Sequence, residues 1–119
     1  MPLSPDVGRA FYGHFPGLHT AQRAAIEPLL AGMDVLVLSR TGSGKTEAVI
    51  APCAERYRSQ ARGAAGPFLL YVTPTRALTN DLLRRLETPL EHLGLTVGIR
   101  HGERNDLARK PPPDLLITT

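Results

Sequence analysis

The sequence predicts an α/β fold, a three-layer sandwich in which helices cover a parallel sheet. Four short apolar runs of strand length recur along the chain, at residues 35–38, 68–72, 95–99 and 115–118, and helical patterns separate them. The first three runs are almost continuously apolar, as in strands covered on both faces. Strands that alternate with helices pair in parallel through right-handed crossovers, which gives the fold class.

A helix is predicted before the first strand. Its N-cap is expected at Thr20, and regularly spaced apolar side chains continue to Gly32, where the helix ends. Pro28 lies inside this helix and Pro52 inside the one expected after the first strand. Each proline removes one backbone donor, so each helix is a candidate for a kink.

The longest helical pattern lies between the second and third strands. From Arg76 onward, leucines recur mostly at every fourth residue and form an apolar stripe on one face, which Gly94 terminates. Pro89 falls within the pattern and cannot donate a backbone hydrogen bond. The helix is therefore expected to kink or split near Thr88.

A glycine-rich turn, SRTGSGKT at residues 39–46, joins the first strand to the following helix. Its backbone N–H groups can converge on a β-phosphate at the positive end of the helix dipole. Lys45 would neutralise the β- and γ-phosphates, and Thr46 carries the hydroxyl that such loops place on Mg2+. These two are the predicted catalytic residues. The full predicted phosphate site consists of Thr41, Gly42, Ser43, Gly44, Lys45 and Thr46.

The same turn leaves alternatives open. Ser39 occupies the first position, where the common pattern has Gly or Ala. Arg40 can face a phosphate or remain a solvated loop arginine. A glycine-rich connection can also do no more than close a strand-helix unit, but the Lys-Thr pair in the correct context favours a nucleotide site.

Composition sets broad limits. The 119 residues are 42% hydrophobic, enough for one small domain with a core. The formal net charge is +3, with 14 basic against 11 acidic residues. This balance is compatible with a polyanionic partner but does not require one.

Cysteine usage fits a reducing compartment. Cys53 is the single cysteine, so no internal disulfide can form, and it is expected as a small apolar core residue rather than a nucleophile. The histidines show no metal-ligand spacing, and no zinc site is predicted. No apolar stretch approaches the roughly 20 residues of a membrane span, and the N-terminus lacks a signal-peptide pattern. A cytoplasmic protein is expected.

A second motif, TPTRAL at residues 73–78, opens the helix after the second strand. In a parallel sheet this turn is expected at the same carboxyl edge as the phosphate loop. Thr75 and Arg76 at a helix N-terminus can hold the phosphates of a nucleic-acid strand without reading its bases. Taken alone, the turn is better explained as a simple capped helix start, and it becomes informative only together with the phosphate loop.

Together, these motifs resemble those of superfamily-two helicases, the group that contains the DEAD-box proteins, and most closely their large helicase-related branch. Residues 41–47 match motif I, including the Glu typical of that branch, and residues 74–78 match motif Ia. Residues 15–22 are similar to the Q motif, and residues 118–119 to the beginning of motif Ib. Residues 101–103 lie where the family has a glycine-containing loop near the nucleic acid.

The resemblance implies that residues 1–119 form part of a first RecA-like ATP-binding domain of the P-loop class, with ATP and Mg2+ as cofactors. It implies that Gln22 contacts adenine and that the partner is DNA or RNA, bound as a single strand through its backbone. The implied nucleic-acid contacts are Pro74, Thr75, Arg76, Gly102, Thr118 and Thr119.

The chain also departs from the family pattern. Arg40 replaces the usual proline, and the acidic motif II and a second RecA-like domain with arginine fingers would follow Thr119. Asp114 precedes its strand and is expected at the opposite sheet edge, and Glu47 is expected on a helix surface, so neither replaces motif II. Because phosphoryl transfer needs all its parts in position, we expect this chain alone, with a sheet incomplete at its C-terminus, to be inactive.

Two other functions remain open from the sequence. A small-molecule kinase or other P-loop phosphotransferase would explain motif I, but it leaves Gln22 and the turn at residues 73–78 without a role. A non-enzymatic truncated remnant would retain the motifs without activity. The intact helicase would couple ATP hydrolysis to strand translocation or unwinding.

Overall fold

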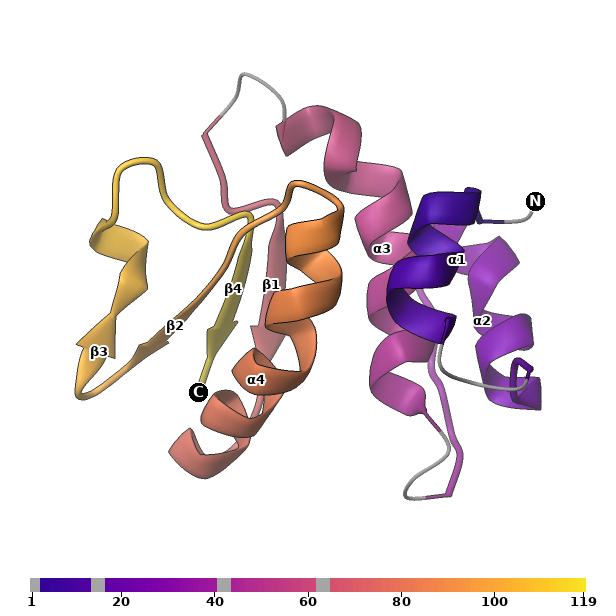
Figure 1. Ribbon diagram of the computed structural model, residues 1–119. Coiled ribbons are helices and arrows are strands. Elements are labelled where there is room, and N and C mark those ends of the chain that lie inside the picture. The colour runs from indigo at the N-terminus through magenta and orange to yellow at the C-terminus, as the bar shows by residue number, and fades with distance from the viewer. Residues whose placement is uncertain (1–2, 14–16, 41–43, 62–64) are drawn as a thin grey trace. The chain divides into compact units, whose positions relative to one another are not determined.

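A computed structural model describes residues 3–13, 17–40, 44–61 and 65–119, with the side chains of 59–61 left aside. The chain divides into two compact units (Figure 1). We call them the N-terminal unit, Met1–Arg56, and the C-terminal unit, Tyr57–Thr119.

The N-terminal unit is built from helices. It contains α1 (Pro5–Tyr12), α2 (Thr20–Leu30) and most of α3 (Lys45–Ala61). Its buried apolar side chains include Val7, Phe11, Ala25, Ala48, Ile50, Ala51 and Ala54. Small residues on α3 allow other apolar groups to approach closely, so a core forms around its first turns.

Helix α2 begins one residue earlier than predicted. Its N-cap is His19, and Thr20 is its first residue, so the predicted N-cap is wrong by one position. The reason is the side chain of Gln22, whose amide oxygen accepts a hydrogen bond from the His19 N–H at 2.9 Å. This contact is the N3 side-chain part of a capping box with His19 as the N-cap. The predicted end is confirmed: Gly32 has a φ of 80°, the left-handed conformation typical of a helix terminus.

Three helices run through a proline. Helices α2, α3 and α4 (Arg76–His92) contain Pro28, Pro52 and Pro89 and are each a single helix. The predicted split near Thr88 is therefore wrong, because one missing donor leaves the neighbouring backbone hydrogen bonds in place. None of the helices in the described ranges is long and apolar enough to cross a membrane.

The strand predicted at residues 35–38 is not formed. Residues 33–40 have no regular secondary structure, and the side chains of Leu36 and Leu38 are each 83% exposed. A strand is defined by backbone hydrogen bonds to a neighbour, and no strand in the described ranges pairs with this segment. Its apolar sequence alone therefore does not make it a strand.

The C-terminal unit contains a four-stranded sheet with the order β1-β4-β2-β3. Its strands are β1 (Leu69–Val72), β2 (Val97–His101), β3 (Arg104–Asn105) and β4 (Leu115–Thr118). Strand β4 lies in parallel between β1 and β2, and the short β3 runs antiparallel to β2. The predicted α/β class with a mainly parallel sheet is confirmed, although β2 lies two residues further along the chain than expected.

Helix α4 packs against β2 and β4 (Figure 1). The predicted leucine stripe supplies Leu82, Leu86 and Leu90, each 5% exposed or less. In β1 the exposure instead alternates, and Leu70 and Val72 are 64% and 66% exposed. The expectation that this strand is covered on both faces is wrong, because α4 covers the neighbouring strands.

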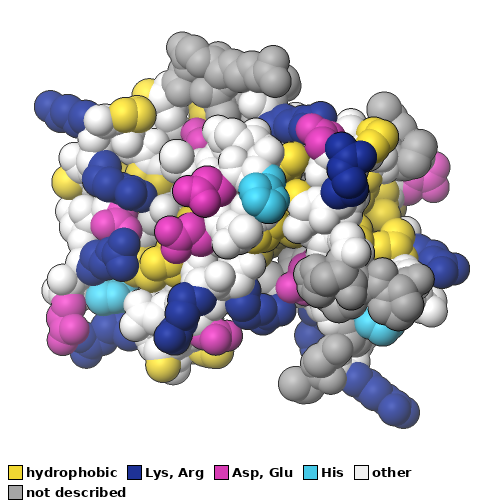
Figure 2. Space-filling view, in the orientation of Figure 1, with side chains coloured by type: hydrophobic (Ala, Val, Ile, Leu, Met, Phe, Trp, Pro, Cys, Tyr) yellow, Lys and Arg dark blue, Asp and Glu magenta, His cyan; other side chains and the backbone are white. Residues whose placement is uncertain are grey.

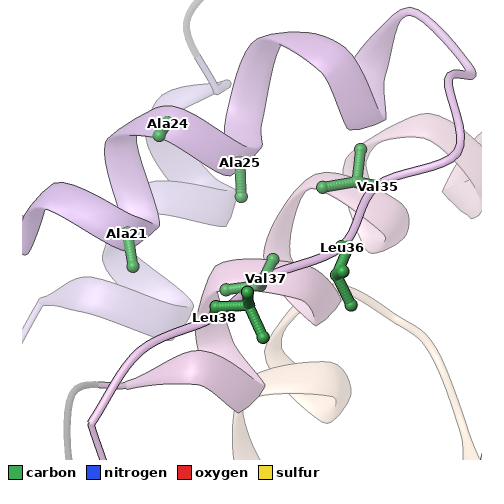
Figure 3. Close-up of a pocket in the computed structure, with 7 residues that line it drawn as sticks. All are labelled: Ala21, Ala24, Ala25, Val35, Leu36, Val37 and Leu38. Atoms are coloured by element: carbon green, nitrogen blue, oxygen red, sulfur yellow. The ribbon is translucent and has the colours of Figure 1, made fainter.

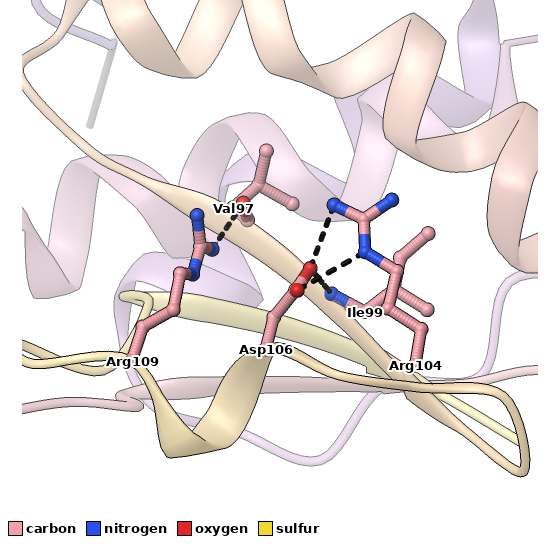
Figure 4. Close-up of polar contacts among 5 residues, drawn as sticks. All are labelled: Val97, Ile99, Arg104, Asp106 and Arg109. Atoms are coloured by element: carbon pink, nitrogen blue, oxygen red, sulfur yellow. Dashed lines mark hydrogen bonds and ion pairs between the residues drawn. The ribbon is translucent and has the colours of Figure 1, made fainter.

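Side chains close the outer edge of β2 before its pairing with β3 begins (Figure 4). Asp106, in the 3-10 turn Asp106–Ala108, accepts the Ile99 N–H at 2.8 Å through Oδ2. Arg109 donates to the Val97 carbonyl at 3.0 Å. The backbone N–H and C=O groups of alternate residues in a strand point to the same edge of the sheet. These two contacts therefore satisfy the Val97 carbonyl and the Ile99 N–H, which an edge strand would otherwise expose.

Arg104 holds the carboxylate of Asp106 in this position. Its Nε donates to Oδ1 at 3.0 Å, and its Nη2 lies 2.9 Å from Oδ2. Burial raises the pKa of Asp106, but the hydrogen bonds from Arg104 and Ile99 and the charges of Arg104 and Arg109 lower it, and the net result is a pKa below the usual value. A lowered carboxyl pKa stabilises the folded state above the unfolded-state pKa, and this contribution is lost as pH falls through the folded-state pKa.

We therefore expect Asp106→Ala to lower the free energy of unfolding at pH 7 by ~1–3 kcal/mol, because it leaves the Ile99 N–H without its acceptor. The difference from the unaltered protein should shrink as the pH falls through the unfolded-state pKa of Asp106 and then through its lowered folded-state pKa. Urea unfolding of both proteins at pH 7 and pH 3 measures it. A difference that stayed constant between these pH values would contradict the role of the charged carboxylate.

Candidate nucleotide and nucleic-acid sites

The described part of the phosphate loop enters helix α3. Thr41, Gly42 and Ser43 lie outside the described residues, whereas Gly44 directly precedes the helix and Lys45 and Thr46 are its first two residues. Gly44 has a φ of 78°, and its carbonyl accepts the Ala48 N–H at 2.9 Å as the first helical hydrogen bond. The predicted transition from glycine-rich turn to helix is thus present at the predicted residue.

The Lys45 side chain reaches back to Ser39. Its Nζ donates to the Ser39 carbonyl at 2.7 Å. A carbonyl carries only a partial charge, and hydrogen bonds between ionised partners are roughly twice as strong as neutral ones. The ammonium group therefore has a partner that an anionic phosphate can replace.

Gln22 connects helix α2 to this loop. Its side chain is fully buried, and Nε2 donates to the Gly44 carbonyl at 3.3 Å while Oε1 accepts the His19 N–H. A Cβ atom on Gly44 would collide with Nε2 of Gln22, so the close approach requires glycine. The structure thus places the predicted adenine-binding residue against the loop, where both polar atoms of its amide are engaged.

Tyr12 of α1 supports the first turn of α3. Its hydroxyl donates to the Glu47 carbonyl at 2.8 Å, and burial together with the charge of Glu47 raises the Tyr12 pKa well above its usual value. The proton of this hydrogen bond therefore stays on Tyr12 at neutral pH. Glu47 is only partly exposed, and its Oε2 is buried, so its predicted placement as a helix-surface carboxylate is corrected.

Cys53 lies further along α3 and is half-buried. Burial raises the pKa of its thiol, with the nearby charge of Arg56 opposing this shift. A raised pKa reduces the thiolate fraction, which is the reactive form. This agrees with the predicted structural role.

A groove of about 180 Å³ in the N-terminal unit lies between α2 and residues 35–38 (Figure 3). Val35 and Val37 face the alanines of α2, whereas Leu36 and Leu38 point away. Its lining residues are Ala21, Ala24, Ala25, Val35, Leu36, Val37 and Leu38. These aliphatic side chains offer no hydrogen-bond donors to phosphate.

In the C-terminal unit, the predicted nucleic-acid residues gather at one sheet edge. Strands β1, β4 and β2 are parallel, so their carboxyl ends meet there, next to the beginning of α4 (Figure 1). All of the predicted residues are exposed or partly exposed: Pro74, Thr75, Arg76, Gly102, Thr118 and Thr119. Sheet topology thus brings together three sequence segments that lie far apart along the chain.

Thr75 caps helix α4 at this edge. Its Oγ1 accepts the Leu78 N–H at 3.2 Å, which confirms the predicted capped helix start. Arg76 is the first helical residue, and the buried Thr79 hydroxyl donates to its carbonyl at 2.6 Å. The backbone at the start of α4 is therefore held by two side-chain hydrogen bonds.

The side chain of Arg76 contacts a second loop. Its Nη1 lies 2.6 Å from Oε1 of Glu103, which belongs to the turn between β2 and β3, and the two side chains are 54% and 77% exposed. Sequence reasoning singled out Gly102 in this turn and missed Glu103 as a partner of Arg76. Only the pairing of the strands brings the two residues together.

Hydrogen bonds connect the three strand ends. The Thr118 hydroxyl donates to the Arg100 carbonyl at 2.8 Å, and the Thr73 N–H donates to the Thr118 carbonyl at 2.9 Å. Asp114, at the other end of β4, accepts the Thr96 N–H at 2.9 Å and so lies at the opposite edge of this sheet, as predicted. That the phosphate loop shares the edge of Arg76 stays a prediction, since the loop belongs to the other unit.

Charged side chains of both signs are mixed on the face of the molecule that Figure 2 shows. Figure 2 shows dark-blue Lys and Arg side chains interspersed with magenta Asp and Glu on the visible face. This face therefore does not present a broad basic surface to a polyanion. Binding of a polyanion would depend on local contacts such as those at the start of α4.

Comparison with known proteins identifies relatives of this arrangement. The DEAD/DEAH box helicase family matches residues 19–119. The "Lhr helicase/ probable uracil glycosylase" of Mycolicibacterium smegmatis is 39% identical over 83% of this chain and 8% of that protein. The "ATP-dependent helicase Lhr-Core" of Methanothermobacter thermautotrophicus is 35% identical over 98% of the chain and 16% of that protein. An "ATP-dependent RNA helicase" of Pyricularia oryzae is 38% identical over 76% of the chain and 16% of that protein.

The chain therefore spans only a small part of the length of these relatives. The family match nevertheless begins at the N-cap of α2, next to Gln22, and extends through the phosphate loop and the edge around Arg76. On this match, and on the similarity to the Lhr proteins over nearly the whole chain, the protein belongs to the DEAD/DEAH box helicase family, in its Lhr-like branch.

Proposed function

We propose that this chain is the ATP-binding part of an ATP-dependent nucleic-acid helicase, in which ATP hydrolysis is coupled to strand translocation or unwinding. The observation that carries the proposal is the arrangement of Gln22, Gly44 and Lys45 at the start of α3. Relatives that are named ATP-dependent helicases support it.

At the proposed nucleotide site, Lys45 exchanges the Ser39 carbonyl for the β- and γ-phosphates of ATP. The positive φ of Gly44 and its contact with Gln22 leave no room for a side chain at the position where the loop enters α3. Thr46 is the proposed Mg2+ ligand, and the bound metal would neutralise charge that develops on the phosphates. Thr41, Gly42 and Ser43 would supply further backbone donors.

At the proposed nucleic-acid site, the phosphates of a single strand of DNA or RNA lie along the edge formed by the three parallel strands. The N-terminus of α4 offers backbone donors and its dipole, and Arg76 offers a guanidinium group. Gly102, Thr118 and Thr119 line the same edge. Such contacts hold the backbone and leave the bases unread.

In this proposal the remaining catalytic parts, a motif II acid and a second RecA-like domain, lie outside the 119 residues. Phosphoryl transfer is catalysed by positioning and charge stabilisation, which require these parts together. The 119-residue chain by itself would accordingly bind ATP weakly and hydrolyse it negligibly.

ATPase rates of the intact protein with and without single-stranded DNA or RNA test the proposed function. We expect stimulation by at least one of these nucleic acids, because strand binding and hydrolysis are coupled in a helicase. A nucleotide-dependent activity that no nucleic acid stimulates would contradict the proposal and favour a P-loop phosphotransferase.

Lys45→Ala should lower the ATPase rate of the intact protein by about 100-fold or more, as expected when a charge-stabilising group is removed from the reacting phosphates. Lys110→Ala is the matched control, since it removes the same charge from an exposed position in the C-terminal unit. Steady-state phosphate release measures both. Equal rates for the two variants would overturn the assignment of Lys45.

Arg76→Ala should weaken binding of a single-stranded oligonucleotide and reduce the slope of log affinity against log salt by about 0.7, the value expected for one lost phosphate contact. Arg84→Ala, an exposed arginine further along α4, is the control. Fluorescence anisotropy over a series of salt concentrations measures both variants. An unchanged slope in Arg76→Ala would contradict a phosphate contact at this residue.

A further inference from the structure

We propose that Glu103 is an internal competitor for the nucleic-acid backbone, because its carboxylate occupies the guanidinium group of Arg76 and must leave before a phosphate binds there. The observation behind this inference is the 2.6 Å ion pair between Arg76 Nη1 and Glu103 Oε1 at the carboxyl edge of the sheet. The inference rests on the proposed nucleic-acid site and adds a regulator to it.

The turn that carries Glu103 is held on both sides. The Glu103 N–H donates to Nδ1 of His101 at 3.1 Å, which fixes the turn just after β2. The next residue, Arg104, pairs with His101 in the sheet and is bound to Asp106. The backbone of Glu103 is therefore held in a turn of the sheet from which its side chain reaches Arg76.

A carboxylate and a phosphate suit Arg76 for the same reason. Both present anionic oxygens that accept charge-assisted hydrogen bonds from a guanidinium group. Both are also favoured near the positive end of a helix dipole. The first turn of α4 contains no acidic residue of its own, so Glu103, from another element, supplies the negative charge at this helix end.

The exposure of the pair makes the exchange possible. With the side chains of Arg76 and Glu103 54% and 77% exposed, solvent screens their attraction, and exposed ion pairs typically contribute little to stability. A strand that brings several phosphates to this edge can therefore displace the carboxylate. Glu103 would weaken strand binding several-fold, so that the edge around Arg76 releases a strand more readily than it would with a free arginine.

The test compares single-strand affinity of the intact protein with that of Glu103→Gln, which keeps the shape of the side chain and removes its charge. Binding of labelled oligothymidylate and oligouridylate is measured by fluorescence anisotropy at low salt. We expect Glu103→Gln to tighten binding by about two- to five-fold, the range that corresponds to an exposed ion pair. Melting curves of the two proteins verify that the fold is unchanged.

Two comparisons separate competition at Arg76 from a general effect of charge. Glu87→Gln removes the same charge from an exposed position near the other end of α4 and should leave the affinity unchanged. In an Arg76→Ala background, Glu103→Gln should have no effect, because the residue it competes for is gone. An equal gain in that background, or weaker binding by Glu103→Gln alone, would overturn the inference.

The outcome also distinguishes this inference from the proposed function. If Arg76→Ala weakens strand binding and Glu103→Gln leaves it unchanged, the competitor role fails and the nucleic-acid site stands. If the unaltered protein binds neither oligonucleotide, both fail.

Discussion

The parallel pairing of β4 with two neighbours is the interaction on which the candidate nucleic-acid site depends. Strand β4 lies between β1 and β2, and its residues Leu115, Leu116 and Ile117 are almost fully buried. Its register with both neighbours brings the carboxyl ends of three strands to one edge. The start of α4, the turn around Glu103 and the end of β4 meet only because of this arrangement, and each would be an ordinary surface loop without it.

The outer boundary of that sheet is secured by side chains. Beyond β2 the short strand β3 continues the hydrogen bonding, and the carboxylate of Asp106 and the guanidinium of Arg109 take over where β3 stops. Gly98 lies between Val97 and Ile99, the two residues whose backbone groups bind Arg109 and Asp106. A Cβ atom on Gly98 would come too close to the side chains of Arg109 and Pro113. An edge closed in this way resists pairing with another chain, while its polar groups also hold the turn that presents Glu103.

Sequence reasoning succeeded where local signals decide the outcome and failed where a distant partner decides it. The cap at Thr75, the leucine stripe of α4 and the glycine that ends it were predictable from spacing alone. Residues 35–38 look like a strand by composition, but strand formation needs a neighbour that sequence cannot identify. Helix α1 was missed, although Pro5 and Asp6 at its beginning are the usual helix-start residues. The pairing of Glu103 with Arg76 has no local signal at all.

The contact between Gln22 and Gly44 has a consequence for how this protein can vary in evolution. Gly44 is constrained twice, by a backbone conformation that disfavours side chains and by an amide that fills the space where one would start. Gln22 is constrained once, through its hydrogen bonds. Substitution of Gln22 by a smaller residue would therefore not make position 44 tolerant. Among homologous sequences, we expect glycine to persist at position 44 even where the glutamine has been replaced.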